Sequence, residues 1–257
     1  MIIIKTKEQI DAMREGGKIL AGILKRITKE VRPGATTGHL EEMACSLISE
    51  AGGRPSFKNY KSKADSKPFP TALCISINNE VVHTPVLPSR KLKEGDIIGI
   101  DIGMEYKKYF TDMATTLPVG SIKKEAKKLI KVTEKSLKLA IKKVKSGATL
   151  NDIAAVVQNY VESHGFSVVR DLVGHGVGTE VHEDPQIPNF VVTKEGYDNV
   201  ILKPGMTLAI EPMVNAGFYE VKTGLDGFSI LTKDGSLSAH FEHTVVVTEK
   251  GCEILTK

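Results

Sequence analysis

Two aspartates in the first half of the sequence could do chemistry together. Asp101 directly follows an apolar run that is rich in β-branched residues and typical of a buried strand, and Asp112 lies in a second strand-like segment, 111–116. If these strands form a hairpin whose turn centres on Tyr106 and Lys107, the aspartates face each other directly, with Cβ atoms roughly 4.5 to 5.5 Å apart. Two carboxylates held that close inside an apolar sheet need a proton or a cation between them. We therefore predict that the pair forms half of a metal site.

The residues between the two strands leave the length of the loop open. They read Glu-Tyr-Lys-Lys over 105–108 and include neither the glycine nor the asparagine of a typical tight hairpin turn, so a longer loop is also compatible with the sequence. Any symmetric loop keeps the two aspartates paired.

The order of segments occurs twice, which indicates an internal duplication. Val-Lys-Ser-Gly-Ala-Thr at 144–149 repeats Val-Arg-Pro-Gly-Ala-Thr at 31–36, and both stretches lie between amphipathic helix patterns. We therefore expect one domain built from two related halves, roughly 1–118 and 119–257.

The duplication supplies two more acids. The segment that ends at Glu211 aligns without a gap on the segment that ends at Asp101. The residues around Glu242 (His-Phe-Glu-His-Thr-Val) resemble those around Asp112 (Phe-Thr-Asp-Met-Ala-Thr). Because duplicated halves usually associate about a pseudo-twofold axis, we predict that the four carboxylates converge where the halves meet.

A cluster of four carboxylates carries too much negative charge to be buried without cations. His175, in the glycine-rich stretch 174–178, could complete the set, because its flanking glycines let the backbone approach a ligand closely. Such an oxygen-rich set favours Mn, Fe or Co, although zinc would also bind. Two ions roughly 3.5 to 4 Å apart can hold one hydroxide and polarise a carbonyl group. The residues therefore point to metal-assisted hydrolysis.

Helical patterns frame these strands. Apolar residues recur at helical spacing over 6–30, a second helix is predicted over about 37–50, and a third over 122–144 has a lysine-rich outer face that is most simply solvated. Between them we expect a mixed loop over 54–70 and a strand over 71–82.

The composition is that of an ordinary soluble globular protein. The 257 residues suit a single catalytic domain, 1–257, and a net charge of +4 does not demand a nucleic-acid partner. The sequence has neither a run of about 18 apolar residues nor a signal-peptide pattern, so we expect a cytoplasmic protein. The three cysteines form no CxxC pair, which argues against a disulfide framework and against a four-cysteine zinc site.

Longer motifs surround these residues. They are Ser-Ile-Asn-Asn-Glu-Val-Val-His (76–83), Gly-His-Gly-Val-Gly (174–178), His-Glu-Asp-Pro-Gln-Ile-Pro (182–188), Glu-Pro (211–212) and Ser-Leu-Ser-Ala-His-Phe-Glu-His-Thr (236–244). Over essentially the whole chain, the sequence resembles type I methionine aminopeptidase. The resemblance implies the α+β pita-bread fold, a curved antiparallel sheet backed by two helix pairs. It also implies removal of the initiator methionine from new proteins whose second residue is small.

The resemblance further implies two divalent ions per chain, Mn, Fe, Co or Zn, and a role for each acid. In this pattern Asp101 binds one ion, and His175 and Glu211 bind the other. Asp112 and Glu242 bridge the two ions. A bridging metal-bound hydroxide would attack the scissile carbonyl, and Glu211 would accept its proton.

The same resemblance identifies residues that contact the substrate. His83 and His182 would bind the substrate and stabilise the tetrahedral intermediate. The pocket for the methionine side chain would include Phe69, Cys74 and Phe228. Many relatives have larger aromatic residues at Phe69, at Phe228 and at Val181, so we expect a roomier pocket with looser selection for methionine. The remaining histidines His39, His164 and His240 are interpreted as surface or core residues without a role.

Two other functions are compatible with these motifs. A proline-specific peptidase, such as a prolidase or aminopeptidase P, shares the five ligands but usually has a large extra domain before the catalytic one. A metal-free ribosome- or nucleic-acid-associated protein on the same fold would have lost ligands, and none is lost here. For the preferred function we expect a monomer that acts on the N-termini of nascent polypeptides, with transient ribosome contact, no membrane association and no stable nucleic-acid partner.

Overall fold

The computed structural model describes residues 1–61 and 67–257, and four helices occur in that part of the chain. They are α1 (Lys7–Thr28), α2 (Thr37–Glu50), α3 (Lys124–Lys143) and α4 (Leu150–Ser163), close to where the sequence predicts them. Three helices begin after a threonine whose side chain accepts a hydrogen bond from a backbone amide of the first turn: Thr6, Thr36 and Thr149. Of the loop predicted over 54–70, residues 62–66 lie outside the described residues.

The strands of the described residues form one large sheet and two small ones, and neighbouring strands run antiparallel. The large sheet has the order β1-β4-β5-β14-β9-β7-β8, with β2 also paired to β4 and β15 to β14. Its strands are β1 (Arg54–Pro55), β2 (Leu73–Ile77), β4 (Ile97–Tyr106), β5 (Tyr109–Pro118), β7 (Gly174–Gly176), β8 (Glu183–Ile187), β9 (Thr207–Ile210), β14 (Glu242–Val247) and β15 (Cys252–Ile254).

The small sheets have the orders β13-β10-β6 and β11-β12-β3. Their strands are β3 (Glu80–Val82), β6 (Ser167–Val168), β10 (Met213–Asn215), β11 (Val221–Thr223), β12 (Ile230–Thr232) and β13 (Ser238–His240). The strand predicted over 71–82 is thus two strands, β2 and β3, separated by a turn in which Asn78 has φ 59°.

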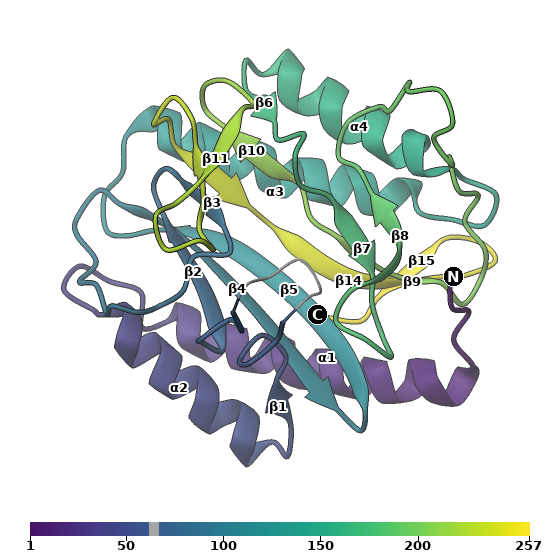
Figure 1. Ribbon diagram of the computed structural model, residues 1–257, viewed down its shortest axis with the longest axis horizontal. Coiled ribbons are helices and arrows are strands. Elements are labelled where there is room, and N and C mark those ends of the chain that lie inside the picture. The colour runs from purple at the N-terminus through teal and green to yellow at the C-terminus, as the bar shows by residue number, and fades with distance from the viewer. Residues whose placement is uncertain (62–66) are drawn as a thin grey trace.

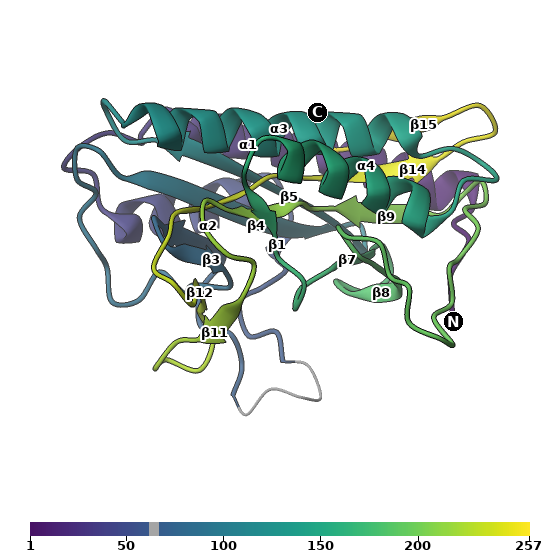
Figure 2. The ribbon, with the colours of Figure 1, turned by 90° about the horizontal axis from the view of Figure 1, so that it is seen from above.

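The elements are arranged in layers (Figure 1). Figure 2 shows α1, α3 and α4 along one side of the large sheet and β3, β11 and β12 on the other side. The helix α2 packs with α1 against β2 and β4. This arrangement is the pita-bread fold that the resemblance implied. It leaves the sheet face opposite the helices available for a site.

The β4–β5 hairpin corrects the predicted register. Asp101 pairs with Ala114, and Asp112 pairs with Gly103, so the two aspartates are diagonal neighbours rather than direct partners. The turn lies at Lys107 and Lys108, which both adopt positive φ values of 50° and 70°. Lysines here take the left-handed conformation that a tight hairpin normally obtains from glycine or asparagine, so the turn falls one residue later than predicted. The resulting shift of two residues leaves both aspartates on the same face of the sheet.

The backbone confirms that the repeated segments adopt the same local structure. In the first half the Gly34 amide donates to the Leu92 carbonyl at 2.8 Å, and in the second half the Gly147 amide donates to the Leu202 carbonyl at 3.0 Å. Each leucine amide then donates back, to Ala35 or Ala148, at 2.8 Å.

The strand register shows one mismatch between the halves. Ile100 pairs with Thr115 in the first half, whereas its repeat equivalent Ile210 pairs with His243 in the second half. Counting from these pairs, Glu242 takes the register position of Ala114, so the strand registers of the two halves differ by two residues. An even shift preserves the face of the strand, and the acids still point to one side.

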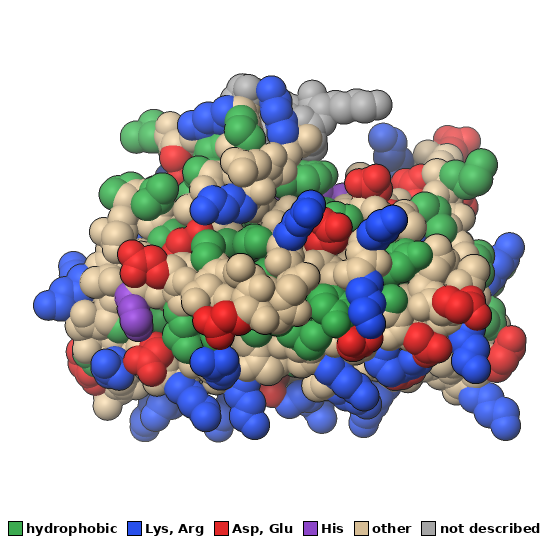
Figure 3. Space-filling model, turned by 90° about the horizontal axis from the view of Figure 1, so that it is seen from below, with side chains coloured by type: hydrophobic (Ala, Val, Ile, Leu, Met, Phe, Trp, Pro, Cys, Tyr) green, Lys and Arg blue, Asp and Glu red, His purple; other side chains and the backbone are tan. Residues whose placement is uncertain are grey.

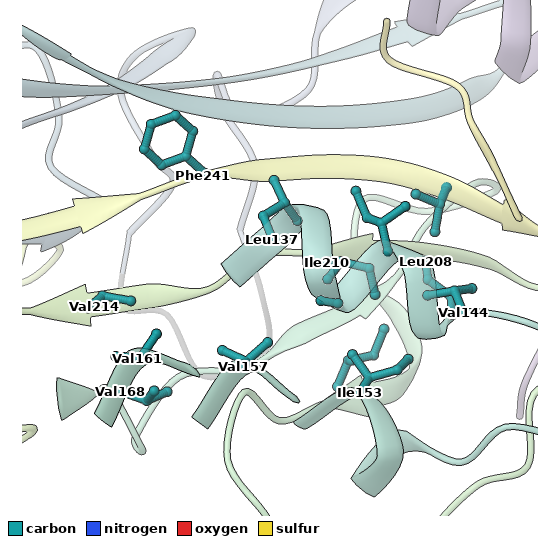
Figure 4. Packing of buried hydrophobic residues seen from close by; sticks show 14 of the residues in the cluster. Leu137, Val144, Ile153, Val157, Val161, Val168, Leu208, Ile210, Val214 and Phe241 are labelled. Atoms are coloured by element: carbon teal, nitrogen blue, oxygen red, sulfur yellow. The ribbon is translucent and has the colours of Figure 1, made fainter. Parts of the chain in front are cut away.

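Two hydrophobic clusters lie between the helices and the large sheet. One joins α1 and α2 to β2 and β4, and the other joins α3 and α4 to β9, β14 and the strand ends around them. Figure 4 shows part of the second cluster, in which Leu137 of α3 and Val157 of α4 lie close to Leu208 and Ile210 of β9. The lysines of α3 point outward, as expected, and Figure 3 shows Lys and Arg side chains gathered along the helical side of the molecule.

Candidate active site

A cavity of about 830 Å³ is lined by residues of the large sheet and of the neighbouring strand β12. Its walls include every residue that the sequence analysis placed in the site. These are Phe69, Cys74, His83, Asp101, Asp112, His175, His182, Glu211, Phe228 and Glu242. Segments far apart in the chain therefore bring their polar and aromatic side chains to one place.

Four carboxylates form the floor of this cavity. Asp101 and Asp112 come from the neighbouring strands β4 and β5, Glu242 begins β14, and Glu211 directly follows β9. Asp112, Glu211 and Glu242 are each at most 9% exposed. The strand that carries Asp112 is fixed to β14 by Thr244, whose hydroxyl accepts from the Asp112 amide at 2.9 Å and donates to its carbonyl at 2.8 Å.

The acids are buried without compensating cations. One oxygen each of Asp101, Asp112 and Glu242 is buried and has no hydrogen-bond partner. In the described part of the chain, no lysine or arginine forms an ion pair with any of the four carboxylates, and the basic groups beside Glu211 and Glu242 are histidines. Buried oxygen atoms without partners are costly, so this set fits a divalent cation.

The pKa values of the acids reflect this surplus of negative charge. Burial, together with neighbouring carboxylates, raises the pKa of Asp101, Glu211 and Glu242 well above the usual range. Burial also raises the pKa of Asp112 to about 7. Without a cation, the cluster therefore holds protons at neutral pH.

His175 on β7 presents a neutral imidazole nitrogen to the acids. Its Nδ1–H donates to the carbonyl of Gly176 at 2.9 Å, which leaves Nε2 free, 3.5 Å from Oε1 of Glu211. Burial lowers the pKa of His175 to about 4, so the ring is neutral at physiological pH. Ligand-capable atoms of Asp112, His175 and Glu242 all lie within 4.8 Å of one another. This is the donor set of an oxygen-rich metal site with one nitrogen.

The glycines beside His175 also allow close packing of the backbone of β7. A Cβ at Gly174 would lie 2.4 Å from the Ala209 carbonyl oxygen, and a Cβ at Gly176 would lie 2.2 Å from that of Asp184. Both contacts are with the backbone of neighbouring strands. The glycines therefore let β7 fit closely between β8 and β9, which positions the imidazole.

Two further histidines line the cavity. His83 follows β3 and has φ 58°, a left-handed conformation that non-glycine residues rarely adopt and that is often found at functional sites. The His182 ring packs edge-on against His175, with ring centroids 4.5 Å apart, and its Nδ1 lies 2.9 Å from the Tyr60 hydroxyl.

An apolar part of the cavity adjoins the acids. The rings of Phe69 and Phe228 meet edge to face with centroids 5.4 Å apart, and the buried Cys74 pairs with Asp101 across β2 and β4. Val181 packs with Cys74 and Phe57 beneath these rings.

The sequence analysis missed three residues of the site. Phe57 and Tyr60 line the cavity from a segment with no periodic pattern, so the sequence held no signal for them. His240, interpreted as a residue without a role, is buried with its Nε2 3.5 Å from Oε2 of Glu211. A signal was present here, because His240 precedes Glu242 by two positions and alternate residues of an extended chain share a face.

A curved antiparallel sheet that buries four carboxylates and an imidazole defines this protein as a metal-dependent hydrolase of the pita-bread fold. Comparisons with known proteins give the family. Residues 11–249 match metallopeptidase family M24. The methionine aminopeptidase of Clostridium perfringens is 48% identical over 257 residues, covering 100% of this chain and 99% of the relative.

Solved structures agree. The methionine aminopeptidase of Thermotoga maritima superposes with a TM-score of 0.94 at 44% identity, and the match covers 100% of both chains. The chain therefore belongs to metallopeptidase family M24 and, within it, to the methionine aminopeptidases. Membership in a metallopeptidase family implies the use of a divalent metal.

The proline-specific alternative is only distantly related. The prolidase of Pyrococcus horikoshii has a TM-score of 0.76 at 22% identity, and the match covers 100% of this chain but 64% of the prolidase. That likeness shows a shared fold alone. Among the described residues, no helix is long and apolar enough to cross a membrane.

Proposed function

We propose that this chain, 1–257 acting as one catalytic domain, hydrolyses the peptide bond after the initiator methionine of new proteins whose second residue is small. The observation that carries the proposal is the group of four carboxylates, three of them with a buried oxygen that has no partner, beside the neutral imidazole of His175. The full-length similarity to methionine aminopeptidases supports the substrate class.

We infer that the acids hold two divalent ions. Asp101 would bind one ion, His175 and Glu211 the other, and Asp112 with Glu242 would bridge them. The grouping of Asp112, His175 and Glu242 within 4.8 Å supports a shared position for the bridging acids. When bound, divalent ions polarise a carbonyl group and make a nucleophile available at neutral pH. The oxygen-rich set suits Mn, Fe or Co, and zinc would also bind.

The protein side chains around this group would move protons and orient the substrate. Glu211 is the proposed proton acceptor, since its buried carboxylate lines the cavity. His83 and His182 line the cavity, and we assign their N–H groups to bind the substrate and donate to the developing oxyanion.

The apolar end of the cavity would bind the methionine side chain. Phe69, Cys74 and Phe228 supply its walls, and Val181 packs behind them. A thioether fits between aromatic rings because sulfur–aromatic contacts are favourable. The proposed partner is the N-terminus of a nascent polypeptide. Ribosome contact, a monomeric state, a cytoplasmic location and the absence of a stable nucleic-acid partner remain predictions from the sequence.

Cleavage of a short peptide tests the proposal. The purified protein, supplied with Mn, Fe or Co, should release free methionine from Met-Ala-Ser, and a chelator should abolish the reaction. A Xaa-Pro dipeptide and Met-Leu-Ser, whose second residue is large, are the matched substrates that should be cleaved poorly. Turnover of the Xaa-Pro substrate without release of methionine would reassign the enzyme to the proline-specific class.

A further inference from the structure

His240 is a buried histidine that the proposed chemistry does not use. It is 3% exposed, and its Nε2 has no hydrogen-bond partner. That nitrogen lies 3.5 Å from Oε2 of Glu211 and 4.0 Å from Oε2 of Glu242. His175 Nε2 lies 3.5 Å from the other oxygen of Glu211. The Glu211 carboxylate is therefore flanked by two imidazoles, one beside each oxygen.

The position of the His240 ring is set by its backbone. The Thr116 hydroxyl of β5 accepts from the His240 amide at 2.9 Å and donates to the His240 carbonyl at 2.8 Å. On the other side, β13 pairs with β10, where His240 is the partner of Met213. Because the backbone is fixed from both sides, the imidazole has a defined direction towards Glu211.

We propose that His240 is a positioning residue, whose Nε2–H donates to Oε2 of Glu211 and holds this carboxylate in the orientation that binds the metal. The inference rests on the proposed function, since it takes Glu211 as a metal ligand and proton acceptor. A neutral imidazole has one N–H donor, and a carboxylate oxygen is the acceptor within its reach. His240 lies outside the compact group of Asp112, His175 and Glu242, which favours an orienting role over direct ligation.

Groups that orient metal ligands in this way have measurable effects. Replacing such a partner typically weakens metal affinity or activity by about 10- to 100-fold. The effect on metal affinity appears without any substrate, so it can be measured even if the peptide specificity is different from the one proposed.

The test replaces His240 with glutamine or asparagine, two amide side chains of different length. The side-chain nitrogen of glutamine can occupy the position of Nε2, whereas that of asparagine ends near Nδ1 and falls short of Glu211. We expect His240→Asn to weaken Co²⁺ binding, measured by isothermal titration calorimetry, by about 10- to 100-fold. We expect His240→Gln to bind close to the wild-type affinity. His243→Gln, which changes a neighbouring histidine bonded to Thr256 instead of the acids, is the matched control.

Three results would overturn the proposal. These are wild-type affinity in His240→Asn, an equal loss in both His240 variants, or a similar loss in the His243→Gln control. The visible absorption of the bound Co²⁺ decides between orientation and ligation. If the wild type and His240→Gln have the same Co²⁺ band positions, His240 orients Glu211. If the bands of His240→Gln instead show that a nitrogen ligand has been lost, His240 binds the metal directly. Weak cleavage of Met-Ala-Ser by a wild-type protein that shows this pattern would count against the proposed function alone.

Discussion

Glu211 and His83 line the same cavity but have different proposed roles. Glu211 is buried among carboxylates and imidazoles, and burial together with the charge of Asp112 raises its pKa. His83 lies beyond β3 at the cavity wall, in a left-handed backbone conformation that aims its side chain. The first residue would contact the metal and the transferred proton, whereas the second would contact the substrate alone.

This difference predicts contrasting variants. Glu211→Gln should lower kcat by several orders of magnitude and reduce bound metal, because it removes both a ligand and the proton acceptor. His83→Ala should lower kcat by about 10²- to 10³-fold, the usual cost of one oxyanion donor, while the metal content stays complete. Steady-state kinetics combined with elemental analysis checks both variants. Lost metal in His83→Ala would show that this histidine is a ligand, and near-normal turnover in Glu211→Gln would remove it from proton transfer.

The buried ion pair between Lys5 and Glu183 holds the loop between β7 and β8 in place. Glu183 accepts hydrogen bonds from the Thr179 hydroxyl at 2.7 Å and the Glu180 amide at 3.1 Å, and its other oxygen pairs with Lys5. The side chains of Lys5 and Glu183 are 1% and 4% exposed. Because His182 directly precedes Glu183, the segment before α1 anchors the loop that carries a proposed substrate-binding histidine.

Removal of one charge should therefore destabilise the protein. Lys5→Met leaves Glu183 buried without its partner, which typically costs about 3 to 5 kcal/mol in the free energy of unfolding. Lys7→Met, two residues along at an exposed position, should change it by less than about 0.5 kcal/mol. Urea denaturation of the two variants measures the difference. Equal stabilities would mean that the ion pair does not anchor the loop.

The whole molecule joins its two halves where the acids meet. β5 of the first half pairs with β14 of the second, and Glu242 is the partner of Ala114 at that seam. Each half has its own hydrophobic cluster against its own helix pair. Carboxylates from both halves thus face one cavity at their junction, where mutual repulsion opposes folding unless protons or cations are bound.

The stability of the metal-free protein should accordingly fall as pH rises. The folded state holds carboxyl protons that the unfolded chain has already released, because the folded pKa values are raised, that of Asp112 from 3.8 to about 7. The free energy of unfolding therefore decreases between about pH 4 and pH 7, and Asp112 alone accounts for about 4 kcal/mol.

A bound divalent cation should offset this loss, since it stabilises the ionised acids of the folded state. Chemical denaturation between pH 5 and pH 8, with chelator and with Mn²⁺, tests this expectation. Stability that rises with pH in the chelated protein would show that the acids are already compensated by the protein.

The sequence by itself determined the parts of this protein that depend on local pattern. Helical periodicity placed the helices, and the repeated segments around Gly34 and Gly147 revealed two related halves. Acids at equivalent strand ends indicated the chemistry. These features are readable because periodicity and repetition involve residues that are close in the chain or identical in type.

Only the tertiary structure decided the hairpin register, the contacts of Tyr60 and the place of His240 beside Glu211. The register depends on Lys107 and Lys108 adopting positive φ, which their residue type does not favour. The other contacts join segments far apart in the chain, so they are set by how the strands pack against one another. No local pattern contains that information.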